Sequence, residues 1–121
     1  MIPVDMQAME ALLAPPGHVP AIGTETLVGT TTTADVDIVH TTSATGTVRY
    51  VAHVAGKPSA VLQLVTMDGS LALICNAYTV PNLRRTGLAR LLLERARADH
   101  DRVVHATHLS EDGAAFARAV G

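Results

Sequence analysis

Hydrophobic and polar residues alternate with the period of a β-strand from residue 47 onward. Residues 47–54 predict a half-buried strand, because a period of two places successive side chains on opposite faces of a sheet. A turn signal at 56–58 (Gly-Lys-Pro) precedes a second predicted strand at 59–67. Asp-Gly at 68–69 favours a hairpin into a third strand at 71–79, which is apolar on both faces and therefore expected to be central. These three strands are expected to form an antiparallel meander.

The period changes to that of a helix after Pro81. Leucines recur three and four positions apart, which predicts an amphipathic helix over residues 85–98. A short strand follows at 103–107, and a closing helix is expected to begin near Ser110. Because the helix carries the chain back across the sheet, the strand at 103–107 is predicted to run parallel to the last strand of the meander.

The first part of the chain is harder to interpret. Residues 4–13 have helical spacing and stop at a pair of prolines, and residues 36–40 alternate as in a short strand. The threonine-rich segment 24–33 is compatible with a β-rich oligomer contact or with a flexible surface loop. Residues 1–46 therefore receive no assignment within a single predicted domain, 1–121.

The order of elements predicts an α/β (α+β) fold, with an antiparallel meander, a late parallel strand and flanking helices. A hydrophobic fraction of 48% and a charged fraction of 17% indicate a globular chain. The net charge is −2, and the aromatic residues are two tyrosines and one phenylalanine. Binding to nucleic acid is not expected, since it requires a basic surface and, for single strands, aromatic platforms.

The sequence indicates a cytoplasmic protein. Cys75 is the only cysteine, so the chain has no internal disulfide, as is usual in a reducing compartment. Residues 1–9 contain Asp5 and no basic start, unlike a signal peptide. No apolar run approaches the roughly 20 residues that span a bilayer, so no contact with a membrane is expected.

The segment most indicative of chemistry is 80–89, Val-Pro-Asn-Leu-Arg-Arg-Thr-Gly-Leu-Ala, between a predicted buried strand and an amphipathic helix. The first N–H groups of a helix have no intrahelical acceptor, and the helix dipole adds partial positive charge there, so such a turn suits an anion. Gly87 lets a ligand approach the backbone, and Arg84 and Arg85 offer charged donors for phosphate. The residues therefore favour a pyrophosphate site; an ordinary helix start with a solvated basic turn is the alternative.

The pattern Arg84-x-x-Gly87-x-Ala89 resembles the pyrophosphate-binding signature of the GNAT N-acetyltransferases, (Gln/Arg)-x-x-Gly-x-(Gly/Ala). The preceding strand, the leucine-rich helix and the later strand and helix also fall where that family has them, so the resemblance covers residues 47–121. Short GNAT-like chains with a similar Ser-x-Asp-Gly-x-x-Phe-Ala ending look like proteins of actinobacteria and their phages.

The resemblance implies an N-acyltransferase that uses acetyl-coenzyme A or another acyl-coenzyme A as co-substrate and no metal. Direct attack of an amine on the thioester would transfer the acyl group. Backbone groups would hold the pantetheine arm and the acyl carbonyl at Tyr78, Thr79 and Val80. Backbone N–H groups would hold the pyrophosphate at Arg85, Thr86, Gly87, Leu88 and Ala89.

The chain departs from the family pattern where catalytic groups are expected. The position of a proton-donating tyrosine in many relatives holds Ala117, or Phe116 in the neighbouring register, and the strand at 71–79 has no carboxylate to act as base. No catalytic residue is assigned, and Tyr78 is a weak candidate for the acid. The sequence also ends at Gly121, before two further strands of the fuller fold. Weak or partner-dependent activity in a homo-oligomer is therefore expected; the alternative is a non-catalytic binding or structural module, such as a phage accessory or virion protein.

Other reactive side chains have simpler interpretations. Cys75 lies in an apolar run without a basic neighbour, which favours packing over nucleophilic chemistry. His105 and His108 lack a recognisable set of further ligands and are expected on opposite faces of a strand, so no metal site is predicted. Glu111 and Asp112 are interpreted as capping charges of the closing helix.

Overall fold

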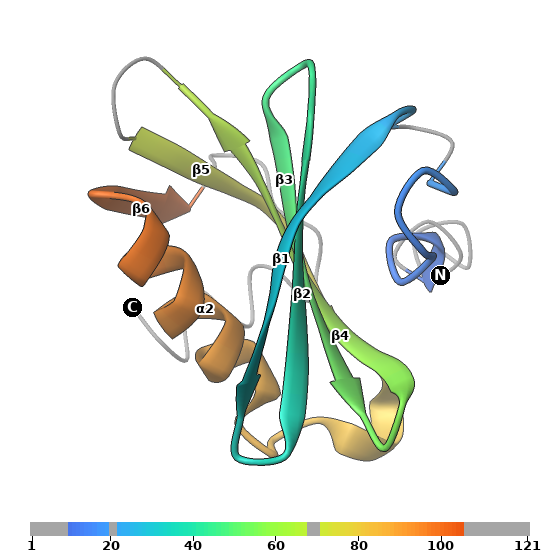
Figure 1. Cartoon of the computed structure of the whole chain (residues 1–121). Coiled ribbons are helices and arrows are strands. Elements are labelled where there is room, and N and C mark those ends of the chain that lie inside the picture. Colours follow the sequence, from blue (N-terminus) through green and yellow to red (C-terminus); the bar gives the residue numbers. More distant parts are fainter. Residues whose placement is uncertain (1–9, 20–21, 68–70, 106–121) are drawn as a thin grey trace, which may run out of the picture.

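The computed structural model describes residues 10–19, 22–67 and 71–105 (Figure 1). In chain order its elements are β1 (Glu25–Thr33), β2 (Val36–Ser43), β3 (Thr47–Val54), β4 (Lys57–Thr66), β5 (Leu71–Thr79), the 3₁₀ turn η1 (Pro81–Leu83), α2 (Leu88–Asp99) and β6 (Arg102–His105).

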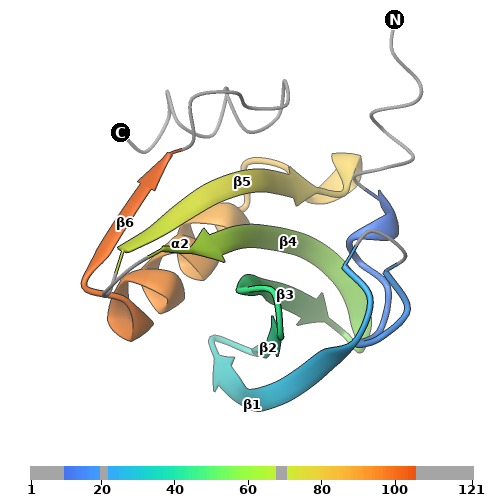
Figure 2. The same cartoon turned by 90° about the horizontal axis from the view of Figure 1, so that it is seen from above.

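The strands form one six-stranded sheet in the order β1-β2-β3-β4-β5-β6. The first five are antiparallel to their neighbours, and β6 is parallel to β5 after the crossover through α2. The sheet curves around α2, which lies on its concave side (Figure 2). The predicted fold class, a meander followed by a late parallel strand, is confirmed.

The three strands of the predicted meander are present as β3, β4 and β5. The turn before β4 is shorter than expected, because Ala55 and Gly56 both have positive φ, 53° and 80°. Two successive residues with positive φ make the tight turn that suits the right-handed twist of a hairpin. Lys57 and Pro58, predicted as part of the turn, therefore already belong to β4. The hairpin signal at 68–69 lies outside the described residues.

The threonine-rich segment is a strand, β1, and not a surface loop. It pairs along its length with β2, which runs to Ser43 and so extends beyond the strand predicted at 36–40. Most of its side chains are exposed on both faces. A strand that is buried on neither face has no hydrophobic alternation, which is why periodicity did not reveal it.

The main core lies between the concave face of the sheet and α2. The helix contributes buried side chains three and four positions apart: Leu88, Leu92, Leu93 and Ala96. They pack against inward positions of β2 to β5, including Ile38, Tyr50, Leu62 and Ile74. Burying each large aliphatic side chain contributes about 1.5–3 kcal/mol, so this interface fixes the position of the helix on the sheet.

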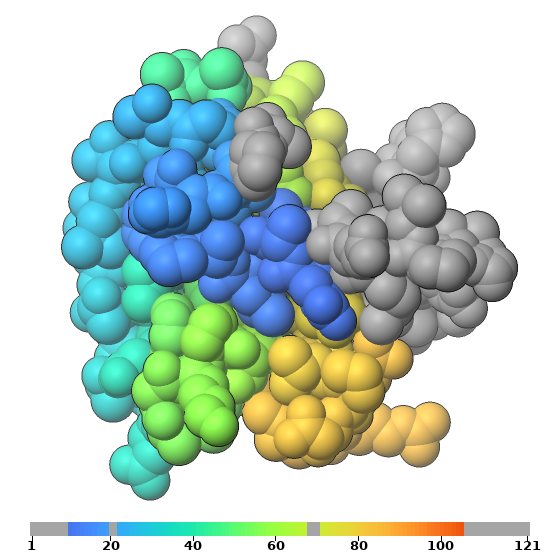
Figure 3. Space-filling view, turned by 90° about the vertical axis from the view of Figure 1, so that its right-hand side faces the viewer, coloured from blue at the N-terminus to red at the C-terminus, as the bar shows by residue number. Residues whose placement is uncertain are grey.

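The opposite face of the sheet is covered by residues 10–19, hereafter the N-terminal segment (Figure 3). Leu12 and Val19 of this segment form a second cluster with Val51, Val61 and Tyr78 of the sheet. Of the helix predicted at 4–13, Glu10 and Ala11 are helical, Leu12 and Leu13 form a turn, and the earlier residues lie outside the described part. The predicted closing helix also lies outside it. Among the described residues, no helix is long and apolar enough to cross a membrane.

Candidate functional site

The strands β5 and β6 pair over a short stretch, from Leu71↔Arg102 to Ile74↔His105. The next residue of β5, Cys75, is an extra residue in the ladder with β4, since Gln63 pairs with Asn76 and Leu64 with Ile74. Such a β-bulge bends its strand and turns the side chains that follow it. The second half of β5 therefore continues past the described end of β6 with a changed direction.

The chain leaves β5 through a turn that is tied back to the sheet. The Val80 N–H donates to the carbonyl oxygen of Ser59 (2.9 Å), and Pro81–Leu83 form the 3₁₀ turn η1. The Thr86 hydroxyl then donates to the carbonyl oxygen of Leu83 (2.5 Å). These bonds fix the turn against the end of β5.

The loop 84–89 ends at a helix start with positive backbone torsions. Arg85 has φ of 66° and Gly87 φ of 88°, both in the left-handed region. A right-handed helix cannot include these residues, so α2 begins at Leu88 and not at residue 85 as predicted. A non-glycine residue with positive φ costs free energy, and such strain is often found where a loop binds a ligand.

The N–H groups at the start of α2 are directed out of the helix. The first i→i−4 bond of α2 runs from the Leu91 N–H to the carbonyl oxygen of Gly87 (3.0 Å). The N–H groups of Leu88, Ala89 and Arg90 come before this bond and therefore have no acceptor within the helix. Within the described residues, no side chain caps this end. Gly87 is exposed, and a Cβ placed on it meets no described heavy atom within 4 Å. The backbone thus offers several donors and room for a ligand, in the field of the helix dipole.

The two arginines of the loop are placed differently. The Arg84 Nε donates to the carbonyl oxygen of Thr79 (3.0 Å), and its guanidinium lies 5.7 Å from the centre of the Tyr78 ring. Arg84 therefore stabilises the end of β5. Both arginines are exposed, but Arg84 is engaged at the end of β5, so Arg85, beside Gly87, is the better placed of the two to meet an anion.

The three residues expected to hold the pantetheine arm lie at the end of β5. Because the Val80 N–H donates to Ser59, it is engaged within the sheet. Backbone groups of neighbouring strand residues point to opposite sides, so Thr79 directs its N–H and carbonyl away from β4 and toward the side on which β6 lies. The Arg84 contact with the Thr79 carbonyl agrees with this direction.

Tyr78 lies on the face covered by the N-terminal segment. Its side chain is 2% exposed and packs in the second cluster. Its hydroxyl donates to Glu10 Oε1 at 3.5 Å, a long hydrogen bond. The tyrosine therefore has a packing role, and its hydroxyl is directed toward the N-terminal segment.

The remaining sequence candidates do not form a reactive centre among the described residues. Cys75 is half-buried; burial raises the pKa of its thiol, and its Sγ lies 3.6 Å from the Leu73 carbonyl oxygen. Burial, together with the positive charge of Arg97, lowers the pKa of His105. No group of three metal-ligating side chains occurs in the described part of the chain. His108, Glu111, Asp112, Phe116 and Ala117 lie outside it.

Sequence reasoning missed a polar cluster at the other end of α2. Asp99, the last residue of the helix, contacts Tyr50 of β3 and His40 of β2. Two local signals mark this place: a carboxylate at a helix C-terminus, where the dipole disfavours it, and a glycine, Gly29, within the threonine-rich strand.

The sequence matches no protein-family model and no curated protein sequence. Solved structures are similar in fold. The aminoglycoside antibiotic 6′-N-acetyltransferase AAC(6′)-Ig from Acinetobacter haemolyticus superposes with a TM-score of 0.51 at 18% identity, over 62% of this chain and 61% of that one. A GNAT-family acetyltransferase from Streptococcus pneumoniae aligns with a TM-score of 0.49 at 23% identity, over 61% of this chain and 58% of that one.

Nourseothricin acetyltransferase aligns with a TM-score of 0.49 at 16% identity, over all of this chain and 79% of that one. The chain aligns with less than two thirds of the pneumococcal and Acinetobacter proteins. Identities in this range bear on the fold alone. The mixed sheet, its crossover helix and the superposition on the Acinetobacter enzyme together show that the chain has the fold of the GNAT acetyltransferases.

Proposed function

We propose that this protein is an acyl-coenzyme A-dependent N-acyltransferase that transfers an acetyl group from acetyl-coenzyme A to an amine. One observation carries the proposal: α2 begins directly after the exposed Gly87, without a side-chain cap in the described residues. The backbone donors at this helix start suit a pyrophosphate, and the loop adjoins the end of β5.

The loop 84–89 would bind the pyrophosphate mainly through its backbone. The N–H groups of Leu88, Ala89 and Arg90 are available at the helix start, and Arg85 adds an exposed guanidinium. The absent side chain of Gly87 leaves the space through which phosphate oxygens would reach these donors. Arg84 would act indirectly, by holding the end of β5.

Acetyl-coenzyme A supplies an activated acetyl group as a thioester. The amine nitrogen attacks the carbonyl carbon, the C–N bond forms as the C–S bond breaks, and the proton lost by the amine is taken up by the thiolate or by water. The chain would contribute orientation, with the Thr79 N–H as the donor best placed to polarise the carbonyl.

Calorimetry with acetyl-coenzyme A tests the site. We expect wild type to bind and Gly87→Glu to lose binding, because the new side chain places bulk and negative charge in the loop. Arg85→Ala is expected to weaken binding by roughly 1–3 kcal/mol, the usual scale of a charged hydrogen bond. Arg84→Ala is expected to have a smaller effect.

Arg102→Ala, which removes an exposed arginine at the start of β6, is the matched control and should bind as wild type does. Because glutamate at Gly87 also strains the backbone, Arg85→Glu serves as a second variant that adds negative charge, at a position that already tolerates a side chain. Equal binding by wild type and both charge variants, or no binding by wild type, would contradict the site. Binding without thiol release in the presence of diverse amines would contradict acyl transfer.

We also propose a cytoplasmic location and a homo-oligomeric state. A single cysteine without an internal disulfide partner supports the first. The edge strand β1, which has no charged residue from Thr26 to Thr33, supports the second.

A further inference from the structure

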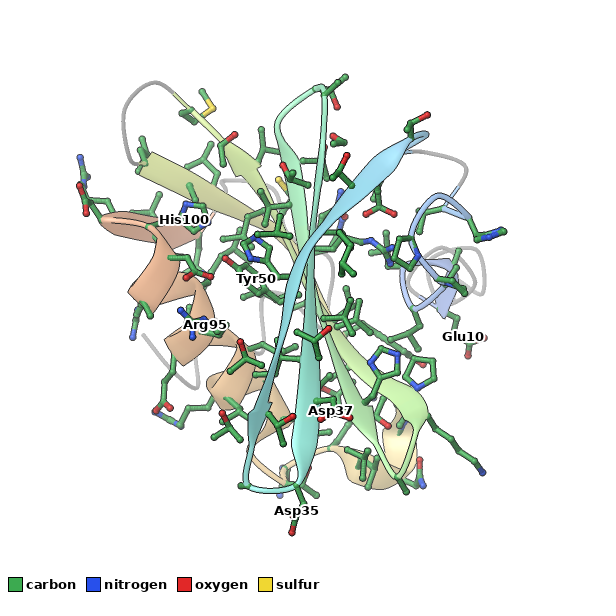
Figure 4. The ribbon with its side chains drawn as sticks, in the orientation of Figure 1. Glu10, Asp35, Asp37, Tyr50, Arg95 and His100 are labelled. Carbon is green, nitrogen blue, oxygen red and sulfur yellow. The ribbon has the colours of Figure 1, made fainter. Side chains whose placement is uncertain are left out.

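A cluster of polar side chains joins the C-terminal end of α2 to the sheet, far from the loop 84–89. Asp99 is its centre: Oδ2 accepts from the Tyr50 hydroxyl (2.9 Å), and Oδ1 accepts from Arg95 Nη2 (2.6 Å). Tyr50 extends from β3 toward the helix, where Arg95 and His100 lie (Figure 4). The Asp99 cluster is defined here as His40, Tyr50, Arg95, Asp99 and His100.

Two histidines complete the cluster. The His40 ring stacks on the Tyr50 ring at 4.4 Å between centres, and its Nδ1 lies 3.6 Å from Asp99 Oδ2. His100 Nε2 lies 3.2 Å from the Tyr50 hydroxyl oxygen. Burial lowers the pKa of His40, and although Asp99 opposes this, the net direction is downward. His40 is therefore uncharged near neutral pH, and Asp99 is paired with Arg95.

A hollow of about 190 Å³ opens beside the cluster, between β1, β2 and the end of α2. His40, Arg95 and Asp99 line its polar side. Ile38, together with β1 residues that include Gly29 and Thr31, lines the rest. Small ligands bind in concave sites where a few polar groups converge to fix their orientation, and His40, Arg95 and Asp99 converge here.

The hollow depends on Gly29. This glycine pairs directly with His40 in the sheet, and it follows Val28, the extra residue of a β-bulge. It is not among the glycines with positive φ, so the backbone does not require it. A Cβ at Gly29 meets no described heavy atom within 4 Å, because the hollow lies there. A glycine within a strand costs about 0.5–1 kcal/mol relative to alanine, and it often marks the approach of a ligand.

Asp99 also departs from a local preference. A carboxylate at the last residue of a helix faces the negative end of the dipole, which is unfavourable. A purely structural role accounts for part of this arrangement, since the buried Tyr50 hydroxyl needs a partner. That role does not account for the glycine, the bulge or the hollow. Departures from local rules that converge at one place are typical of a functional site.

We propose that this hollow binds a small molecule through a primary ammonium group. The Asp99 carboxylate and the terminal carbonyls of α2 attract a cation, and the uncharged His40 ring forms one side of the site. The Arg95–Asp99 pair is partly exposed, with side-chain exposures of 32% and 24%, and such pairs are weak. An entering ammonium group would replace Arg95 at Asp99 Oδ1. An anion would be opposed by this carboxylate and would find Arg95 already paired with it.

The proposed ammonium site is distinct from the acyl-transfer site. In the sheet, His40 pairs with Tyr50, Tyr50 with Leu62, and Leu62 with Ala77 of β5. Three strand spacings of about 4.8 Å separate His40 from β5, or roughly 14 Å. The ammonium site therefore does not depend on the proposed acyl transfer, and it can be tested without acetyl-coenzyme A.

The test is a titration with n-butylammonium chloride, followed by NMR of the imidazole groups. We expect saturable shifts of the His40 and His100 signals, and no such shifts with sodium butyrate, which reverses the charge, or with 1-butanol, which removes it. Asp99→Asn keeps the shape of the side chain and should weaken binding about tenfold or more, the usual effect of losing a charge-assisted hydrogen bond. Asp37→Asn changes an exposed carboxylate of β2 and should leave binding unchanged.

Gly29→Val tests the hollow independently of charge. Valine suits a strand and fills the space above His40, so this variant should fold, as judged by its thermal transition, and lose binding. Should Gly29→Val destabilise the protein, Gly29→Ala provides the smaller step, with weaker binding expected. Absence of a saturable shift in wild type, stronger binding of butyrate than of butylammonium, or unchanged binding in Asp99→Asn would each overturn the proposal.

Discussion

Arg49 of β3 and Glu25 of β1 form a two-pronged ion pair that is buried beneath the N-terminal segment. Nη2 and Nε of the arginine donate to Oε1 and Oε2 of the glutamate, both at 2.7 Å, and the two side chains are 1% and 0% exposed. The Thr41 hydroxyl donates to Glu25 Oε2 (2.7 Å), and the Gly17 N–H to Oε1 (3.1 Å).

The other nitrogen of this guanidinium reaches the N-terminal segment. Arg49 Nη1 donates to the carbonyl oxygens of Leu12 and Ala14. The arginine therefore joins the edge strand β1, the central strand β3 and the N-terminal segment. Nearly every donor and acceptor of the pair has a partner, which is the condition under which a buried ion pair is tolerated.

We predict that Arg49→Ala lowers the free energy of unfolding by about 3–5 kcal/mol, because it leaves the Glu25 carboxylate buried without its partner. The measurement is urea unfolding followed by circular dichroism. Arg102→Ala, at an exposed position, should change stability by about 0.5 kcal/mol or less. The double variant Arg49→Met, Glu25→Gln should lose less than Arg49→Ala. A loss below about 1 kcal/mol in Arg49→Ala would show that the pair is not the anchor described here.

The same pair predicts a loss of stability in acid. Burial raises the pKa of Glu25, but hydrogen bonds from Arg49, Thr41 and Gly17 outweigh it, so the net pKa lies below the ordinary value. The folded state then binds the Glu25 proton less readily than the unfolded state. The contribution of ionised Glu25 to the free energy of unfolding is complete above the pKa of glutamate in the unfolded state, about 4.3. It is lost as pH falls through the lower pKa of Glu25 in the folded state.

Unfolding free energies measured from neutral pH down to about pH 3 check this prediction. The free energy of unfolding of Glu25→Gln should fall less steeply with decreasing pH than that of wild type, since the titrating carboxyl is gone. Asp35→Asn, in the exposed turn between β1 and β2, should retain the wild-type slope. Asp99 also has a lowered pKa, since hydrogen bonds from Arg95 and Tyr50 outweigh its burial, so some acid dependence should persist in Glu25→Gln. Identical slopes for wild type and Glu25→Gln would refute the assignment.

Arg49 also shows which features of the fold sequence periodicity does not predict. Alternation predicted the strand at 47–54, because this pattern follows from near neighbours in the chain. The pattern predicted a half-buried strand, whereas the structure buries five consecutive residues of β3, among them Arg49. The burial of Arg49 depends on Glu25, 24 residues earlier, and on a segment that covers the second face. Contacts between residues so far apart in the sequence produce no periodic pattern around either residue.

The candidate site divides in the same way. The loop 84–89 was predictable, because a glycine and arginines before an amphipathic helix form a contiguous signal. The engaged Val80 N–H and the contact of the Arg84 guanidinium with the Tyr78 ring were not, since both depend on how β5 bends after its bulge. The Asp99 cluster was missed because its residues come from β2, β3 and α2, far apart in the sequence.

Tyr78→Phe tests whether the weak candidate acid contributes to catalysis. Removing a positioned general acid usually costs about 10²–10⁴ in rate. Because the hydroxyl of Tyr78 is directed to Glu10 and its ring is buried in the second cluster, we expect a change in kcat of less than about tenfold. The values of kcat and KM are measured by thiol release from acetyl-coenzyme A in the presence of a panel of amines. A hundredfold or greater fall in kcat at unchanged KM would instead identify Tyr78 as the acid.

The last prediction concerns the edge strand β1. Its residues from Thr26 to Thr33 include no charged residue and no proline, although natural edge strands usually carry such residues to prevent pairing with other chains. Leu27 and Val28 are each 55% exposed, and within the described part of the chain β2 is the only neighbour of β1 in the sheet. Two copies of β1 are therefore suited to pair edge to edge and extend the sheet.

Sedimentation velocity over a range of concentrations should show a reversible dimer of wild type. Leu27→Lys together with Val28→Lys should weaken dimerisation by about tenfold or more, since two like charges on each strand would face their copies across the interface. Ala98→Lys adds a charge at an exposed position of α2 and should leave the dimer intact. A wild type that stays monomeric at every concentration, or a dimer that tolerates both lysines on β1, would show that this edge is not the contact. Because the substituted side chains are already in solvent, folding of the monomer should be unaffected, and a change in mass would report on association alone.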